Sequence, residues 1–286
     1  MVTKADYGKR EVEASRSVLV ELIHLLGEFK DSIVLVGGSV PPLLYREIAK
    51  DYVGTLDVDL ALNHLTIDDE TYQTIRNTLL KRGYKEGEQP FIFYREVPTE
   101  YGNPVIVEVN FLSGEYGGTG KSHRTQKVQD VRARKARGCD LAFENFLNVE
   151  MEADLPGGGK DQITCKVATI VPFIVMKGMA LADRMKEKDA WDLYYCLTHH
   201  PDGIEKLIEE FRPHISYKLV QEALRKISEK FASPEHIGPR HVADFEGITD
   251  MEEREALQRD VFERVDYLLK NLRDMVNKNL VLNGIH

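Results

Sequence analysis

Cysteine is scarce in this sequence, and sequence repeats and low-complexity segments are missing. The cysteines are three in number and far apart, with no Cys-x-x-Cys spacing: Cys139, Cys165 and Cys196. This pattern excludes a disulfide framework and predicts buried thiols in a reducing compartment. The nine histidines show no spacing typical of metal ligands. A small disulfide-stapled or zinc-stapled domain is therefore not expected.

Long hydrophobic runs are also lacking. Residues 1–16 contain no apolar core of the kind that a signal peptide has. The most apolar stretch, residues 167–182, is interrupted by Pro172 and Lys177 and is shorter than the ~20 apolar residues of a spanning helix. We therefore expect a soluble, cytoplasmic protein with no membrane partner.

Basic residues are outnumbered, with 38 Lys and Arg against 47 Asp and Glu and a net charge of −9. This balance argues against a protein that binds nucleic acid over its whole surface. The 286 residues, 42% of them hydrophobic, are enough to bury a sizeable core. The acidic average nevertheless hides one basic segment.

Residues 121–138 carry seven basic residues and one acid, Asp130. The basic residues are Lys121, Arg124, Lys127, Arg132, Arg134, Lys135 and Arg137. Such a segment can attract RNA, a nucleotide or an acidic partner protein. The alternative is an exposed loop with no ligand.

Hydrophobic periodicity predicts an α+β fold in which a mixed sheet is flanked by helices and followed by a C-terminal helical region. Predicted strands span 32–36, 55–62, 91–97 and 104–112, and 145–152 pairs with 163–168 as a hairpin. Predicted helices span 11–29, 68–81, 203–211, 216–231 and 250–280, and from Pro172 on the pattern is nearly all helical, with residues 233–248 as a connection. We expect one domain over 1–200 and a helical region over 201–286.

Two acids interrupt the apolar strand predicted at 55–62. Asp57 and Asp59 are two residues apart, so strand alternation places both carboxylates on one face of the sheet. Like charges so close repel each other, and a divalent cation with oxygen ligands relieves this repulsion. The pair therefore predicts a Mg²⁺ site, with Mn²⁺ as an alternative ion. The competing interpretation is a solvated sheet face.

A third acid, Glu108, lies in the strongly apolar strand predicted at 104–112. If this strand lies beside Asp57 and Asp59, the three carboxylates form a cluster able to hold two metal ions. Two metals can activate an attacking oxygen and stabilise a leaving oxygen in phosphoryl transfer. Asn110, two residues further on the same face, could also touch this site. The alternative for Glu108 is an edge-strand charge facing water.

The strand at 32–36 runs into Gly37-Gly38-Ser39, and this turn has features that a triphosphate needs. Glycines let the backbone approach phosphate closely, Ser39 offers a hydroxyl, and the start of the following helix is expected to present free N–H groups. Pro41 and Pro42 fall in the first turn of that helix, where proline is tolerated.

Together these segments resemble a known superfamily. The runs VGGSVPPLLYREI, GTLDVDLAL and VIVEVNFL look like the ordered motifs of DNA polymerase β-type nucleotidyltransferases. The run VPFIVMKGMALADRMKEKDAWDLYYCL resembles the AbiEii toxin group within that superfamily. The resemblance covers roughly residues 32–197 and leaves the terminal helices out.

The resemblance implies a role for each matching position. The turn of Gly37, Gly38 and Ser39 would hold the phosphates of a nucleotide. The acids Asp57, Asp59 and Glu108 would ligate the metals, and Glu108 would also help to deprotonate the acceptor hydroxyl. In the later motif the implied residues are Lys177 and Arg184, which would meet the triphosphate or acceptor, and the acid Asp192, with Asp189 as the alternative.

Helical geometry predicts how the basic residues of the later motif are arranged. If 173–195 formed one helix, then Lys177, Arg184 and Lys188 would lie on nearly one face. That face would present a cationic stripe. The alternative is that a new helix starts at residues 186–189 and that Arg184 pairs with the neighbours of Lys188.

The resemblance implies an enzyme that transfers a nucleoside monophosphate from an NTP such as ATP to an acceptor hydroxyl and releases pyrophosphate. It also implies a toxin of a toxin–antitoxin or phage-defence system, with an antitoxin partner and tRNA or RNA ends as acceptor, reached through residues 121–138. One alternative is a small-molecule nucleotidyltransferase of the aminoglycoside type. Another is a non-catalytic binding module that retains the fold.

Overall fold

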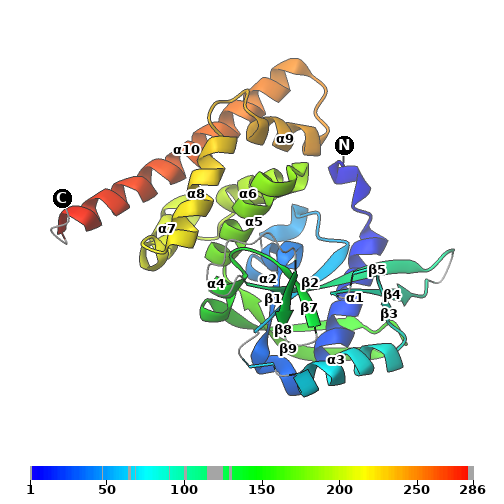
Figure 1. Ribbon diagram of the computed structural model, residues 1–286. Coiled ribbons are helices and arrows are strands. Elements are labelled where there is room, and N and C mark those ends of the chain that lie inside the picture. The colour runs from blue at the N-terminus through cyan, green and yellow to red at the C-terminus, as the bar shows by residue number, and fades with distance from the viewer. Residues whose placement is uncertain are drawn as a thin grey trace. The chain divides into compact units, whose positions relative to one another are not determined.

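The computed structural model describes residues 2–46, 48–63, 66–67, 69–89, 91–99, 102–114, 125–128 and 131–282 (Figure 1). The chain divides into two compact units. The sheet unit comprises Tyr7–Leu44 and Val53–Pro172, and the helical unit comprises Met1–Asp6, Tyr45–Tyr52 and Phe173–His286. The short segment Tyr45–Tyr52 therefore belongs to the helical unit although both of its sequence neighbours belong to the sheet. The boundary that we expect near residue 200 falls within the helical unit.

The sheet unit is built on one mixed sheet, which has nine strands in the described part of the chain. Seven strands follow the order β3-β4-β5-β2-β1-β9-β8, and β7 pairs with both β5 and β6. Parallel pairing joins β2 to β5, β1 to β9 and β5 to β7, and the other pairs are antiparallel. The strands are β1 (Ile33–Val36), β2 (Asp57–Leu62), β3 (Lys85–Glu86), β4 (Ile92–Val97), β5 (Val105–Ser113), β6 (Thr125–Val128), β7 (Val131–Lys135), β8 (Phe146–Asp154) and β9 (Lys160–Ala168).

Helices flank this sheet. They are α1 (Lys9–Leu25), α2 (Val40–Leu44), α3 (Asp69–Lys81) and α4 (Cys139–Glu144). The long helix α1 packs against β2, β4, β5, β8 and β9 (Figure 1). Its apolar stripe, including Val18, Leu19 and Leu22, is fully buried there. The helix ends at Leu25, and residues Gly27–Ser32 continue as a 3₁₀ segment.

The helical unit contains six helices in the described residues: α5 (Ile170–Arg184, which joins this unit at Phe173), α6 (Glu187–Thr198), α7 (Gly203–Phe211), α8 (Lys218–Lys230), α9 (Ile237–Glu246) and α10 (Met251–Leu282). The prediction of a connection over 233–248 is wrong, because α9 lies within it. Pro239 sits in the first turn of α9, where it displaces no hydrogen bond within the helix. The buried side chains of Val242 and Phe245 lie on this helix, which packs against α6 and α10.

The predicted fold class is confirmed: a mixed sheet with flanking helices is followed by a C-terminal helical region.

Alternation of side chains along β2 explains why these residues form a strand with one polar face. Val58 and Leu60 are fully buried, whereas Asp57 and Asp59 on the other face are partly exposed. Among the described residues, no helix is both long and apolar enough to cross a membrane.

Candidate functional site

The predicted Gly-Gly-Ser turn follows β1 directly. Gly37–Ser39 forms a single 3₁₀ turn, and Gly37 has a φ of +73°, a left-handed conformation that glycine adopts without strain. A Cβ atom at this position would overlap the carboxylate of Asp59. Because β1 and β2 pair Val36 with Asp59, the register places Asp59 beside this turn. The tertiary structure thus joins two of the predicted motifs.

One expectation about this turn is wrong. The helix after Ser39 was expected to present free N–H groups, but α2 has only five residues. The Val40 N–H donates to the carbonyl of Gly37, and Pro41 and Pro42 have no N–H to offer. At the start of α2, residues Val40, Pro41 and Pro42 therefore have no main-chain donor to offer an anion.

The acids of β2 and β5 are neighbours across a parallel pair of strands. The register pairs Asp57 with Glu108 and Asp59 with Asn110. Partners in a parallel ladder point to the same side of the sheet, so these four polar side chains share one face. The predicted proximity of Glu108 to the two aspartates is confirmed at this level.

Each end of the Asp57–Glu108 row has a donor from the protein itself. The Thr55 hydroxyl donates to Oδ1 of Asp57, and Ser15 of α1 donates to the Asp57 carbonyl at 3.0 Å. On the other side, Tyr94 of β4 is the register partner of Glu108. Burial, followed by the charge of Glu108 and the hydrogen bond to it, raises the pKa of Tyr94. The Tyr94 hydroxyl is therefore protonated at neutral pH, and its residue lies beside Glu108 in the register.

The fit of these residues to a metal ion depends on how the side chains are arranged and on which donor atoms they offer. Within the described part of the chain, no group of three His, Cys, Asp or Glu side chains is arranged to hold a metal. However, Asn110 is only 3% exposed and its Oδ1 makes no hydrogen bond. Carboxylate and amide oxygens are the ligands that Mg²⁺ takes, and a buried oxygen without a partner is costly. The donor set therefore fits a hard cation, although the side chains have not converged on one point.

The residues of the later motif form a separate, buried ion-pair cluster in the helical unit. Nζ of Lys177 lies 3.0 Å from Oδ1 of Asp189 and 2.6 Å from Oδ2 of Asp192. Arg184 makes a bidentate pair with Asp189, with distances of 2.7 and 2.8 Å. Lys188 pairs with Asp192 at 2.8 Å. Both aspartates are essentially inaccessible to solvent.

Mutual compensation sets the protonation of this cluster. Burial alone would raise the pKa of Asp189, but Lys177 and Arg184 hold it well below its usual range. Burial alone would lower the pKa of Lys177, but the charges of Asp192 and Asp189 raise it. Asp189 and Lys177 are therefore both ionised at neutral pH.

The single helix over 173–195 is wrong, and the alternative of a new helix is confirmed. The chain breaks between α5 and α6, where Met185 has a φ of +47° and Lys186 is extended. Arg184 pairs with Asp189, a neighbour of Lys188, as the second interpretation stated. The break folds α6 back so that its carboxylates meet the cations, and no continuous cationic stripe forms.

Sequence reasoning did not identify Tyr52 as a member of this cluster. Its hydroxyl donates to Oδ1 of Asp192 at 2.8 Å and accepts from Lys188 at 3.2 Å. Its ring also lies 4.9 Å from the Lys188 ammonium. Nothing local in the sequence signals this contact, because Tyr52 lies far from α6 in the chain.

The basic segment 121–138 is described only in part. Lys121 and Arg124 lie outside the described residues, and of the other basic side chains only that of Arg137, which is half-buried, is described.

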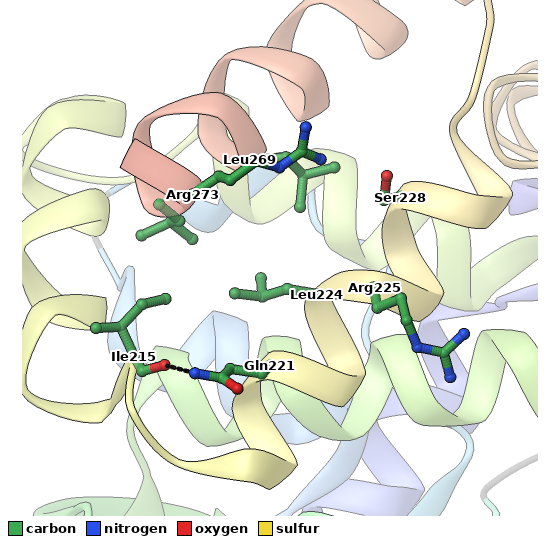
Figure 2. Close-up of a pocket in the computed structure, with 8 residues that line it drawn as sticks. Ile215, Gln221, Leu224, Arg225, Ser228, Leu269 and Arg273 are labelled. Carbon is green, nitrogen blue, oxygen red and sulfur yellow. Dashed lines mark hydrogen bonds between the residues drawn. The ribbon is translucent and has the colours of Figure 1, made fainter. Parts of the chain in front are cut away.

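A cavity of about 270 Å³ lies between α8 and α10 in the helical unit. Leu224 and Leu269 lie on its walls (Figure 2). None of the predicted site residues lines this cavity.

Comparisons with known proteins add one likeness of fold. No protein-family model matches the sequence, and no curated protein matches it. Among solved structures, the chain is similar to an antigenic nucleotidyltransferase-like protein from Paracoccidioides brasiliensis. The two are 16% identical, the match covers 78% of this chain and 89% of that one, and the TM-score is 0.41. A likeness this distant transfers neither activity nor site residues, so the resemblance to the AbiEii group stays a prediction.

Proposed function

We propose that the protein is a metal-dependent nucleotidyltransferase whose reaction site is the polar face of β2 and β5, beside the turn that follows β1. One observation carries the proposal: the fold brings the Gly37 turn, Asp57, Asp59 and Glu108 to adjoining positions on one sheet. These elements come from three separate stretches of the chain. A solvated sheet face would not require a glycine fitted against one of its acids.

A divalent cation held by Asp57, Asp59 and Asn110 would neutralise the phosphates and make the acceptor oxygen more acidic. Glu108 is the third acid of this set and the candidate to receive the acceptor's proton. The Gly38 backbone and the Ser39 hydroxyl would bind and orient the phosphates. Tyr94, the register partner of Glu108, would hold the Glu108 carboxylate in place through its hydroxyl.

The proposed reaction is a displacement at the α-phosphorus of the NTP. The acceptor oxygen forms a bond to the α-phosphorus of the NTP, and the bond from that phosphorus to the pyrophosphate oxygen breaks. The acceptor proton passes to a carboxylate. Pyrophosphate leaves with the bonding electrons.

The later motif supports a positioning role better than direct contact with the nucleotide. Lys177 forms ion pairs with two buried aspartates, and Arg184 makes a bidentate ion pair with one of them. We propose that the cluster fixes α5 to α6. The role of Lys177, Arg184 and Asp192 at the triphosphate stays a prediction.

We further propose RNA or tRNA ends as the acceptor, because the basic segment 121–138 suits a polyanion better than a cationic drug. A toxin role with an antitoxin partner rests on the AbiEii resemblance alone. Incubation with total tRNA and, separately, with an aminoglycoside distinguishes the two acceptor classes.

The test incubates the protein with Mg²⁺, each α-labelled NTP and an acceptor, and measures transferred label. Wild type and the surface variant Asp31→Asn should transfer label, because the Asp31 side chain is 84% exposed and Asp31 precedes β1, whereas the Gly37 turn follows that strand. The double variant Asp57→Asn/Asp59→Asn should lose at least a hundredfold, about 2.7 kcal/mol of transition-state stabilisation. Transfer to no acceptor, or a double variant as active as wild type, contradicts the enzyme proposal. Binding of NTP without transfer would favour the non-catalytic module.

A further inference from the structure

A second cavity, of about 300 Å³, lies wholly within the helical unit. Its walls include Trp191 and Tyr195 of α6, whose ring centroids are 5.0 Å apart. Two carboxylates, Asp51 and Glu246, also line it. None of these residues belongs to the proposed reaction site. Aromatic faces beside carboxylates are the surroundings that favour an organic cation.

The chain itself already places an ammonium in this cavity. Nζ of Lys4 lies 5.5 Å from the centroid of the Trp191 ring and 3.4 Å from Oε2 of Glu246. Glu246 is held in place because its Oε1 accepts the Trp191 indole N–H at 2.5 Å. One wall of the cavity thus demonstrates the contacts that an alkylammonium group makes there.

Two other polar groups of the lining, the Tyr195 hydroxyl and the Asp51 carboxylate, are not paired with other side chains in the described part of the chain. Tyr195 is 3% exposed, and its buried hydroxyl makes no hydrogen bond. Burial and the nearby charge of Asp51 raise the pKa of Tyr195 to about 12, so its hydroxyl is neutral at physiological pH. Asp51 forms no ion pair with any described residue. Lysine and carboxylate side chains give the lining one positive and two negative charges, on Lys4, Asp51 and Glu246.

We propose that this cavity is a binding site for a primary alkylammonium group of a small-molecule ligand. The ammonium would donate to the Asp51 carboxylate and the Tyr195 oxygen while its carbon chain lies along the aromatic walls. The inference is independent of nucleotide transfer, since it rests on different residues.

Other ligand classes fit this cavity less well. A planar heterocycle needs an open ring face, but His199 stacks on Tyr195 with centroids 4.0 Å apart and planes at 13°. Trp191 is only 1% exposed. An anion would meet two carboxylates against a single ammonium, which disfavours it electrostatically.

Trp191 is the chain's single tryptophan, so its fluorescence reports on this cavity directly. Wild-type protein is titrated with 1,5-diaminopentane at constant ionic strength, and KCl at the same ionic strength serves as the salt control. We expect a saturable fluorescence change with the diamine and none with KCl. Asp51→Asn should weaken binding about tenfold, because it removes a charged hydrogen-bond acceptor.

Three further variants sharpen the test. Asp202→Asn, an equivalent change at an exposed position of the same unit, should bind as wild type does. Tyr195→Phe should weaken binding while keeping the ring. Lys4→Ala should tighten it, because the lining loses its own ammonium. Urea unfolding of each variant verifies that the unit is folded.

Three results would overturn the inference. The first is the absence of a saturable fluorescence change in wild type, and the second is an equal change with KCl. The third is binding by Asp51→Asn as tight as binding by Asp202→Asn, since the amine would then occupy another place. Loss of nucleotide transfer in an Asp57 variant would leave all of these measurements unaffected.

Discussion

Asp59 lies directly against the backbone of Gly37, in a space that a single Cβ atom would fill. Through this contact the turn after β1 packs against the acidic strand β2. The contact follows from the register, which pairs Val36 with Asp59. Both the left-handed φ of +73° and the close approach require glycine here. The Gly37–Asp59 contact is therefore a precise place to test the proposed site.

Gly37→Ala should be more harmful than an alanine at another left-handed glycine. Gly158 has a φ of +87°, and a Cβ added there would meet no atom within 4 Å, so Gly158→Ala isolates the backbone cost of about 1–2 kcal/mol. Gly37→Ala adds overlap with Asp59 and should lower the free energy of unfolding by about 1–3 kcal/mol more. Urea unfolding of the two variants measures the difference. Equal destabilisation would show that the contact has no energetic weight.

Asn110→Leu tests the metal proposal. Removing a buried amide oxygen that lacks a partner should leave the melting temperature in EDTA unchanged or raised, since such an oxygen costs about 1–3 kcal/mol. The same change should abolish the stabilisation that excess Mg²⁺ confers on wild type. Ser113→Ala is the matched control on β5, because Ser113 is also buried with an unpaired oxygen. A wild type that Mg²⁺ does not stabilise would contradict the metal site.

Lys177→Met should be strongly destabilising. The substitution leaves Asp189 and Asp192 buried with less compensating charge, and loss of one partner of a buried ion pair typically costs about 3–5 kcal/mol. Lys206→Met, at an exposed position of α7, should change the free energy of unfolding by less than about 0.5 kcal/mol. Chemical denaturation compares them. Similar values for both variants would rule out a structural role for the cluster.

The lowered pKa of Asp189 predicts how stability depends on pH. A carboxyl whose pKa is lowered by folding contributes stability that is present above its unfolded value, near 3.8, and is lost as pH falls toward its folded value. The difference in unfolding free energy between wild type and Asp189→Asn should therefore be constant near neutrality and shrink below about pH 4. A difference that stays constant down to pH 2 would contradict this assignment.

The raised pKa of Lys177 predicts a second limit at high pH. A lysine whose pKa is raised by folding contributes stability that is complete below its unfolded value, near 10.5, and is lost as pH rises toward its folded value. The free-energy difference between wild type and Lys177→Met should therefore start to fall above about pH 10. Urea unfolding across the alkaline range measures it, and a difference that grows with pH would be inconsistent with the cluster.

Local patterns predicted much of the fold. Strands β1, β2, β4 and β5 lie within one or two residues of their expected bounds, because alternation with period two is readable from neighbouring residues alone. Helix α9 escaped prediction, since Gly238 and Pro239 at its start are common in connections. What makes this segment helical is burial of Phe245 and its neighbours against other helices, which the sequence does not show.

Local geometry is enough to predict that Asp57 and Asp59 share one face, that Glu108 interrupts an apolar strand and that a Gly-Gly turn follows β1. It does not predict which of these residues meet. Strand order put Glu108 beside Asp57 and Asn110 beside Asp59, and the break at Met185 turned Lys177, Arg184 and Lys188 toward Asp189 and Asp192. Pairing between distant strands and helices depends on the burial and charge compensation of a whole unit, and no short stretch of sequence contains that information.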